Sequence, residues 1–307
     1  TLSFGLRHFI SLIRSACPRP ERSLRTMLRS AVRLIRHYAP TSYGTPHAGE
    51  FLNQFQGGTV TRTSYGNRDD LALITLNNPA KKNALTGSMM VQFRQAIGEV
   101  AAMTGKLRAV IIRGAEGNFS SGLDLDFIRE TSNYGDGYLL SHFVSDTLWE
   151  MACLPLPVIA VLEQNCLGGA AEIATVADVR VASADARMGF VHARFGITPG
   201  FGSVRFLTDI LGRAMCIELL ATGETIEAER MKELNLVSAV FDGETELNAY
   251  LKRFTVNSKH IVRASKKIVR DTVDKRGWAD RKKAEQQMFL QLWGSKEHRE
   301  MLPAAEK

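Results

Sequence analysis

Two glycine-rich turns are the features of this sequence that are best suited to chemistry. Ser121-Gly122-Leu123 follows a predicted strand, and Gly168-Gly169-Ala170 follows a second strand and opens a helix. Glycine lets a backbone bend tightly and present its N–H groups, and the N-terminus of a helix favours an anion. Two such turns that converge would stabilise a developing oxyanion. Taken singly, each turn is also explained as an ordinary connection between a strand and a helix.

Three side chains are candidates for a catalytic role. Glu172 lies in the first turn of the predicted helix, where a carboxylate either transfers a proton or only interacts with the helix dipole. His192 either supplies a proton or is a core histidine bonded to the backbone. Cys166 has no base beside it in the sequence, so we expect a small buried residue rather than a nucleophile.

The segments that must position these residues alternate between strand and helix patterns. This predicts an α/β fold with right-handed βαβ crossovers, a largely parallel sheet and a C-terminal helical region that packs on the core or on a neighbouring subunit. We divide the chain into an N-terminal extension (1–50), a core (51–257) and the C-terminal helices (258–307), with a linker at 39–57. The predicted strands are Thr59–Thr63, Leu71–Leu76, Leu107–Arg113, Val158–Leu162 and Val179–Val181. The predicted helices are Met89–Ala102 (capped by Thr86), Leu139–Cys153, Glu172–Val176, Val204–Leu211, Ala214–Leu220, Ile226–Glu233, Glu244–Thr255, His260–Val273 and Trp278–Trp293.

Composition and charge exclude several classes of protein. Hydrophobic residues make up 45% of the 307 residues, which is enough for a core without disulfides or metals. The four cysteines lie far apart with no CxxC pair, so we expect a reducing compartment and no metal site. No apolar run reaches the roughly 18 residues that span a bilayer. Residues 1–49 hold eight Arg and one acid, which accounts for the whole net charge of +7, so no nucleic-acid partner is expected for the neutral remainder.

The first fifty residues have the composition of a mitochondrial transit peptide, because they are rich in Arg, contain Ser and are almost free of acids. Between residues 22 and 38, Arg side chains form one helical stripe and apolar side chains cover the opposite face. We therefore expect the matrix, or the matrix face of the inner mitochondrial membrane, as the location. If the segment is kept, residues 1–45 would instead be an arm that docks on a membrane surface or a larger assembly.

A set of motifs in a fixed order is similar to one known family, the crotonase (enoyl-CoA hydratase/isomerase) superfamily. The resemblance covers roughly residues 55–307 and implies a spiral of ββα units. It also implies trimers or dimers of trimers, and an acyl-CoA thioester as the substrate with no further cofactor. The motifs are Leu76-Asn77-Asn78-Pro79, Lys82-Asn83-Ala84-Leu85, Phe119-Ser120-Ser121-Gly122-Leu123-Asp124, Leu154-Pro155-Leu156-Pro157-Val158-Ile159-Ala160, Gly168–Glu172, Gly196-Ile197-Thr198-Pro199-Gly200-Phe201-Gly202 and Leu220-Ala221-Thr222-Gly223.

The resemblance implies a role for particular positions of this chain. The oxyanion donors would be the N–H groups of Leu123 and Gly169, and the catalytic side chains would be Glu172 and His192. The residues expected to contact coenzyme A are Lys81, Lys82, Ala84, Ser121, Gly122, Asp124, Leu125 and Gly168.

The acids at the matched positions decide which chemistry the resemblance favours. A hydratase of this family uses two carboxylates; Glu172 matches the first, but His192 stands at the second. Decarboxylation needs only an oxyanion hole and one proton donor, so these residues favour a decarboxylase. The resemblance implies ethylmalonyl- or methylmalonyl-CoA as the substrate. Ala170, Ser203 and Arg194 also depart from the family pattern. The alternatives are an enoyl-CoA hydratase or isomerase, and an accessory subunit of a mitochondrial membrane complex, such as a respiratory complex, with little or no activity.

Overall fold

The computed structural model describes residues 45–274, 277–293, 295 and 298. The Arg-rich segment, and with it the import signal or docking arm predicted there, lies outside the described residues. None of the helices in the described part of the chain is long and apolar enough to cross a membrane.

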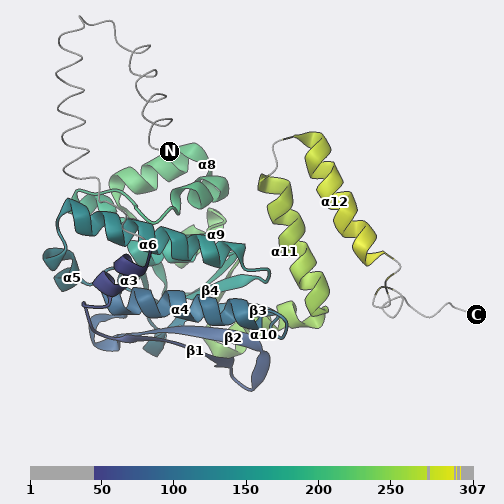
Figure 1. Cartoon of the computed structure of the whole chain (residues 1–307), viewed down its shortest axis with the longest axis horizontal. Coiled ribbons are helices and arrows are strands. Elements are labelled where there is room, and N and C mark those ends of the chain that lie inside the picture. The colour runs from purple at the N-terminus through teal and green to yellow at the C-terminus, as the bar shows by residue number, and fades with distance from the viewer. Residues whose placement is uncertain (1–44, 275–276, 294, 296–297, 299–307) are drawn as a thin grey trace, which may run out of the picture. The chain divides into compact units, whose positions relative to one another are not determined.

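The main sheet has six strands in the order β1-β2-β3-β4-β6-β9 (Figure 1). Only the β1–β2 pair is antiparallel, and the other four pairs are parallel. The largely parallel sheet predicted from the sequence is therefore confirmed. The strands are β1 (Thr59–Tyr65), β2 (Arg68–Asn77), β3 (Ala109–Gly114), β4 (Val158–Leu162), β6 (Val179–Ser183) and β9 (Ala239–Phe241).

The central strands are buried on both faces, which explains their Val- and Ile-rich sequences. Along β3, Val110 and Ile112 face one apolar cluster, whereas Ile111 faces the other. Helix α10 (Gly243–Val256) covers the second cluster with Leu247 and Leu251. The first and larger cluster is covered by helices α4 (Gly87–Met103) and α6 (Tyr134–Cys153), which lie across the sheet in Figure 1.

Helix α4 (Gly87–Met103) begins where the sequence predicts, because the Thr86 side chain accepts a hydrogen bond from the Met89 N–H at 3.3 Å. Helix α3 (Thr45–Leu52) is a difference from the prediction, since it occupies part of the expected linker. Its Ala48 and Leu52 are buried in the first apolar cluster. This apolar contact explains why the segment is helical despite its loop-like composition.

Several boundaries differ from the sequence prediction for local reasons. Helix α6 (Tyr134–Cys153) begins five residues early because Asn133 caps it, accepting from the Asp136 N–H at 3.1 Å. The short α5 (Leu125–Glu130) was not predicted. The two helices expected around residue 212 form one element, α8 (Val204–Thr222), broken at Gly212, whose φ is +73°.

A second sheet of three short strands was also missed by sequence reasoning. It has the order β5-β7-β8, with β5 (Asn165–Leu167), β7 (Arg187–Gly189) and β8 (Thr225–Glu227). Strand β5 leads directly into α7 (Gly169–Val176), and the Gly168 N–H donates to the Gly189 carbonyl at 2.9 Å. The second sheet therefore fixes the turn at the start of α7.

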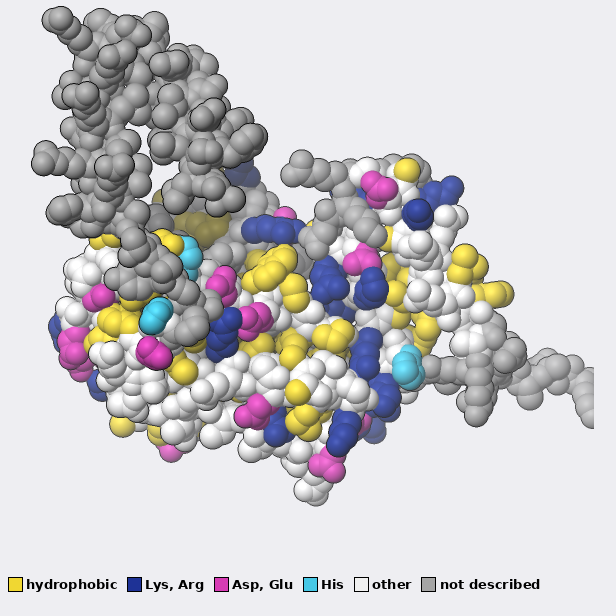
Figure 2. Space-filling view, viewed as in Figure 1, with side chains coloured by type: hydrophobic (Ala, Val, Ile, Leu, Met, Phe, Trp, Pro, Cys, Tyr) yellow, Lys and Arg dark blue, Asp and Glu magenta, His cyan; other side chains and the backbone are white. Residues whose placement is uncertain are grey.

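The C-terminal part of the described chain contains α9 (Ala228–Glu233), α11 (Lys259–Asp274) and α12 (Trp278–Leu292). Helix α11 is joined to the core by basic side chains, which gather along it in Figure 2. Lys266 Nζ lies 2.7 Å from Asp178 Oδ2, and Arg263 and Arg270 donate to the carbonyls of Leu107 and Cys153. The predicted packing of this helical region on the core is observed for α11.

Arg180 on β6 is a buried cation that fixes the far end of α7. Its Nη1 donates to the carbonyls of Ala174, Thr175 and Ala177 at 3.3, 3.2 and 2.6 Å, and its Nε donates to the Leu236 carbonyl at 2.6 Å. Burial lowers the pKa of the guanidinium to about 10, which still leaves it charged at neutral pH. A cation at this end also complements the helix dipole.

We predict that Arg180→Met lowers the free energy of unfolding by about 2–4 kcal/mol, because several buried carbonyl groups lose their donor. Urea denaturation measures the change. Arg187→Met is the matched control, since Arg187 lies on β7 and its side chain is 62% exposed. Equal stability of the two variants would contradict the anchoring role of Arg180.

Candidate active site

The two glycine turns meet, and glycine is required at both for steric reasons. Gly122 has φ +97°, and a Cβ there would lie 2.8 Å from the Leu167 carbonyl oxygen. A Cβ on Gly169 would lie 2.8 Å from a ring carbon of Phe201. A bridge between Ser120 and Cys166 joins the chain segments that lead into the turns. Residues separated by more than forty positions in the sequence thus form one compact unit.

The N–H groups expected to form the oxyanion hole are both available. On either side of Leu123, the Leu85 N–H donates to the Gly122 carbonyl at 2.7 Å and the Asp124 N–H donates to the Leu85 carbonyl at 2.9 Å. Gly169 is the first residue of α7, where an N–H has no partner inside the helix. Among the described residues, neither the Leu123 nor the Gly169 N–H donates to a backbone carbonyl. Both can therefore bind a ligand oxygen.

The Glu172 carboxylate is buried and held by three donors from one loop. The Gly200 N–H lies 3.2 Å from Oε1, and the Phe201 N–H and the Ser203 hydroxyl lie 3.0 and 2.8 Å from Oε2. Glu172 is 1% exposed. Sequence reasoning missed these donors, because they come from a loop that the fold brings back to α7. The glycines at 200 and 202 and the serine at 203 were the signal available in the sequence.

His192 lies beside Glu172. Its Nε2 is 3.2 Å from Glu172 Oε1, and the residue is 8% exposed. The other ring nitrogen, Nδ1, is buried and has no hydrogen-bond partner among the described residues. The alternative of a core histidine bonded to the backbone is not what the structure shows for either nitrogen.

The residues expected to contact coenzyme A come from two segments that lie side by side. The Ser121 N–H donates to the Lys82 carbonyl at 2.9 Å, and the Ser121 hydroxyl donates to the Lys81 carbonyl at 3.1 Å. Ala84 is buried, whereas Lys82 and Leu125 are exposed. Gly122 and Gly168 lie at the junction of the two turns. Ser121, Lys81 and Lys82 are therefore joined directly, and Gly122 lies against Gly168. Contact of these residues with coenzyme A stays a prediction.

Lys81 is not a free cation, because two carboxylates bind it. Its Nζ lies 2.7 Å from Asp124 Oδ2 and 3.0 Å from Asp126 Oδ2. Asp124 also caps α5, accepting from the N–H groups of Asp126 and Phe127. Burial acts to raise the pKa of Asp124, but the hydrogen bonds from Lys81 and from the two N–H groups outweigh it and lower the pKa below its ordinary value. In this structure Lys81 and Asp124 thus fix the segment rather than present free charge.

The departures from the family pattern have structural explanations. Ala170 is helical and buried inside α7, so its methyl group causes no backbone strain. Arg194 reaches the Thr225 hydroxyl at 3.3 Å.

Cys166 is fully buried, and burial raises the pKa of its thiol, which agrees with a small core residue and not a nucleophile.

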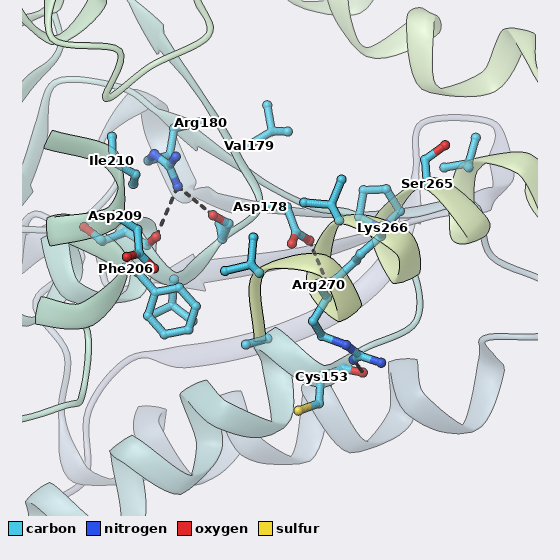
Figure 3. A pocket seen from close by; sticks show the side chains of 18 of the residues that line it. Cys153, Asp178, Val179, Arg180, Phe206, Asp209, Ile210, Ser265, Lys266 and Arg270 are labelled. Atoms are coloured by element: carbon cyan, nitrogen blue, oxygen red, sulfur yellow. Dashed lines mark hydrogen bonds and ion pairs between the residues drawn. The ribbon is translucent and has the colours of Figure 1, made fainter. Parts of the chain in front are cut away.

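Two cavities border different residues of α7. The first, about 10 Å³, is lined by Leu85, Met89, Met90, Phe93, Val144, Thr147, Ile173 and Phe201. The second, about 580 Å³, lies between α11 and the core at the C-terminal end of α7 (Figure 3). Lys266 points toward Asp178 there, and none of the predicted catalytic residues lines it. The larger cavity is therefore separate from the candidate active site.

The described residues contain no cluster of three or more His, Cys, Asp or Glu side chains that could hold a metal ion.

Comparisons with known proteins agree with this geometry. The family model for enoyl-CoA hydratase/isomerase matches residues 66–307. An enoyl-CoA hydratase from Thermoplasma volcanium has a similar structure, with a TM-score of 0.74 and 25% identity, over 81% of this chain and 97% of that chain. A putative enoyl-CoA hydratase from Thermobifida fusca, solved in complex with CoA, matches at a TM-score of 0.65 and 21% identity, over 76% of this chain and 91% of that one. The chain belongs to the enoyl-CoA hydratase/isomerase (crotonase) family, and its fold is the α/β crotonase fold.

Similar sequences within the family carry a more specific name. Ethylmalonyl-CoA decarboxylase from Danio rerio is 33% identical over 291 residues, which is 91% of this chain and 95% of the relative. Ethylmalonyl-CoA decarboxylase from Homo sapiens is 29% identical over 254 residues, covering 79% of this chain and 82% of the relative. The chain is thus an acyl-CoA-binding family member that is similar to these decarboxylases over most of its length.

We predict a pH-dependent effect of Asp124→Asn, a change that keeps the cap of α5 but removes the charge bound by Lys81. The folded state lowers the pKa of Asp124, so the ion pair stabilises the protein above the unfolded-state value of about 4 and is lost as the pH falls through the lower folded value. The variant should therefore have a lower Tm than the natural protein at pH 7, and the difference should close in acid.

Thermal unfolding from neutral to acidic pH measures this difference, with Asp146→Asn as a control on the exposed face of α6. A Tm difference that stays constant across the whole pH range would contradict the ion pair.

Proposed function

We propose that this protein decarboxylates ethylmalonyl-CoA or methylmalonyl-CoA. The observation that carries the proposal is the buried Glu172–His192 pair beside two free N–H groups, those of Leu123 and Gly169. The similarity to proteins named ethylmalonyl-CoA decarboxylase over most of both chains supports it.

The reaction that this site supports has two steps. The thioester oxygen of the substrate binds to the N–H groups of Leu123 and Gly169. When the bond between the α-carbon and the carboxylate breaks, CO₂ leaves and the electron pair stays on the thioester as an enolate, whose oxygen the two N–H groups stabilise. A proton from the Glu172–His192 pair then forms the new C–H bond at the α-carbon.

Hydration fits this site less well than decarboxylation. In the hydratases of the family, two carboxylates position and activate a water molecule. Here a single carboxylate, Glu172, is already bound by three donors, and His192 stands in the place of the second acid. Both Glu172 oxygens are engaged, so neither is left over to activate water.

The proposal predicts that the purified full-length protein releases CO₂ from ethylmalonyl- or methylmalonyl-CoA. Glu172→Gln should lower kcat by about 100-fold or more, because it disrupts the Glu172–His192 pair and a positioned acid–base pair contributes roughly 10²–10⁴-fold. Release of labelled CO₂ from a carboxyl-labelled substrate measures the rate. Glu229→Gln is the control, an exposed carboxylate in α9, and should leave the rate unchanged.

Two other outcomes would contradict the proposed decarboxylation and favour a different function. Hydration of an enoyl-CoA without release of CO₂ would identify a hydratase. An absence of turnover of any acyl-CoA, together with co-purification in a mitochondrial membrane complex, would favour the accessory-subunit alternative. The Arg-rich segment at residues 1–49 is the observation behind that alternative.

We also propose a mitochondrial location, in the matrix or at the matrix face of the inner membrane. Eight Arg residues and one acid within residues 1–49 support it. Import of the full chain into isolated mitochondria, and loss of import when residues 1–44 are deleted, is the expected result. Equal import of both forms would contradict the proposal.

A further inference from the structure

The Glu172 carboxylate has no lone pair left for a transferable proton. Oε1 faces the Gly200 N–H and the His192 Nε2, while Oε2 faces the Phe201 N–H and the Ser203 hydroxyl. Two of these donors are backbone N–H groups, which can neither turn away nor accept a hydrogen bond. A proton on either oxygen would have to displace one of these hydrogen bonds inside a buried site, which costs free energy. Both oxygens of the Glu172 carboxylate are therefore already bound by neighbouring groups.

His192 has the complementary arrangement. Its Nε2 lies 3.2 Å from Glu172 Oε1, so this edge of the ring is turned toward the carboxylate. The carboxylate positions the ring. Nδ1 is then the ring nitrogen that carries a transferable proton, and it is the one that is buried with no partner among the described residues. A buried polar atom without a partner is unusual in a folded protein and points to a ligand group as its partner.

We infer that His192 is the proton donor of the reaction and that Glu172, held by Ser203, is a positioning residue. This inference rests on the proposed decarboxylation. The Nδ1–H bond of the imidazolium breaks, its electron pair stays on Nδ1, and the enolate uses its own electron pair to form the C–H bond at the α-carbon. The products are the saturated acyl-CoA and a neutral imidazole, which takes a proton from water before the next turnover. Before CO₂ leaves, the same Nδ1–H group is the donor for the carboxylate of the substrate.

The configuration of the product at its α-carbon shows whether a fixed group of the protein delivers the proton. Decarboxylation of ethylmalonyl-CoA in deuterium oxide places one deuterium on the α-carbon of butyryl-CoA, and a donor fixed in the protein delivers it to one face only. The natural protein should give a single configuration. His192→Gln keeps a group that can bond to Glu172 but cannot transfer a proton. It should lower kcat by about 100-fold or more, and its residual product should contain both configurations.

Glu172→Gln should also be slow, yet its product should keep the single configuration, because His192 is still present. Ser203→Ala removes one hydrogen bond from Glu172 and should lower kcat by roughly 3- to 10-fold with an unchanged KM and a single configuration. Thr175→Val is the matched control, since Thr175 is a buried hydroxyl residue on the same helix whose side chain donates to the Ala171 carbonyl at 2.7 Å. It should leave both kcat and configuration unchanged.

The outcomes separate the inference from the proposed function. A single configuration from His192→Gln together with mixed product from Glu172→Gln would overturn the inference and make Glu172 the donor. A Ser203→Ala variant with normal kcat would also overturn the positioning role of Glu172. This variant tests the inference even if the His192→Gln protein does not fold. If the natural protein releases no CO₂ from either substrate, the proposed function itself fails.

Discussion

The hydrogen bonds that hold the Glu172 carboxylate are the interaction on which the rest of the site depends. They join the first turn of α7 to the loop at Gly200–Ser203 and place His192 against the same carboxylate. At the other end of α7, Arg180 binds the last carbonyl groups of the helix. A helix of eight residues is too short to be stable alone, so its position is imposed from both ends. The Gly169 N–H is presented at a fixed place for that reason.

Steric contacts also explain the glycines of the two turns. Close approach to the Leu167 carbonyl favours glycine at Gly122, and close approach to the ring of Phe201 favours glycine at Gly169. The side chain at position 192 is not part of either glycine turn, and it contacts the Glu172 carboxylate instead. Exchange of a carboxylate for a histidine there changes what the site can do with water and with a proton. The family implies an acyl-CoA ligand, and the side chain at position 192 is the basis for the reaction that we propose.

The sequence predicted the parts of this structure that are encoded locally. Val158–Leu162 is a continuous apolar run and forms β4 with the predicted bounds, and Thr86 caps α4 as expected. Strand β5, with three residues, has no periodicity to recognise. In the site, the glycine turns and Glu172 were found from motifs. The three donors to Glu172 were not, because they belong to a loop about thirty residues away that only tertiary packing brings to the carboxylate.

The central claim is that the two turns bind a thioester oxygen opposite His192. A crystal structure of the full-length protein with bound butyryl-CoA, the product of the proposed reaction, tests it most directly. The account predicts that the thioester oxygen lies about 2.7–3.1 Å from the N atoms of both Leu123 and Gly169, with the α-carbon facing His192 Nδ1. A thioester oxygen bound elsewhere, or an α-carbon that faces away from His192, would contradict it.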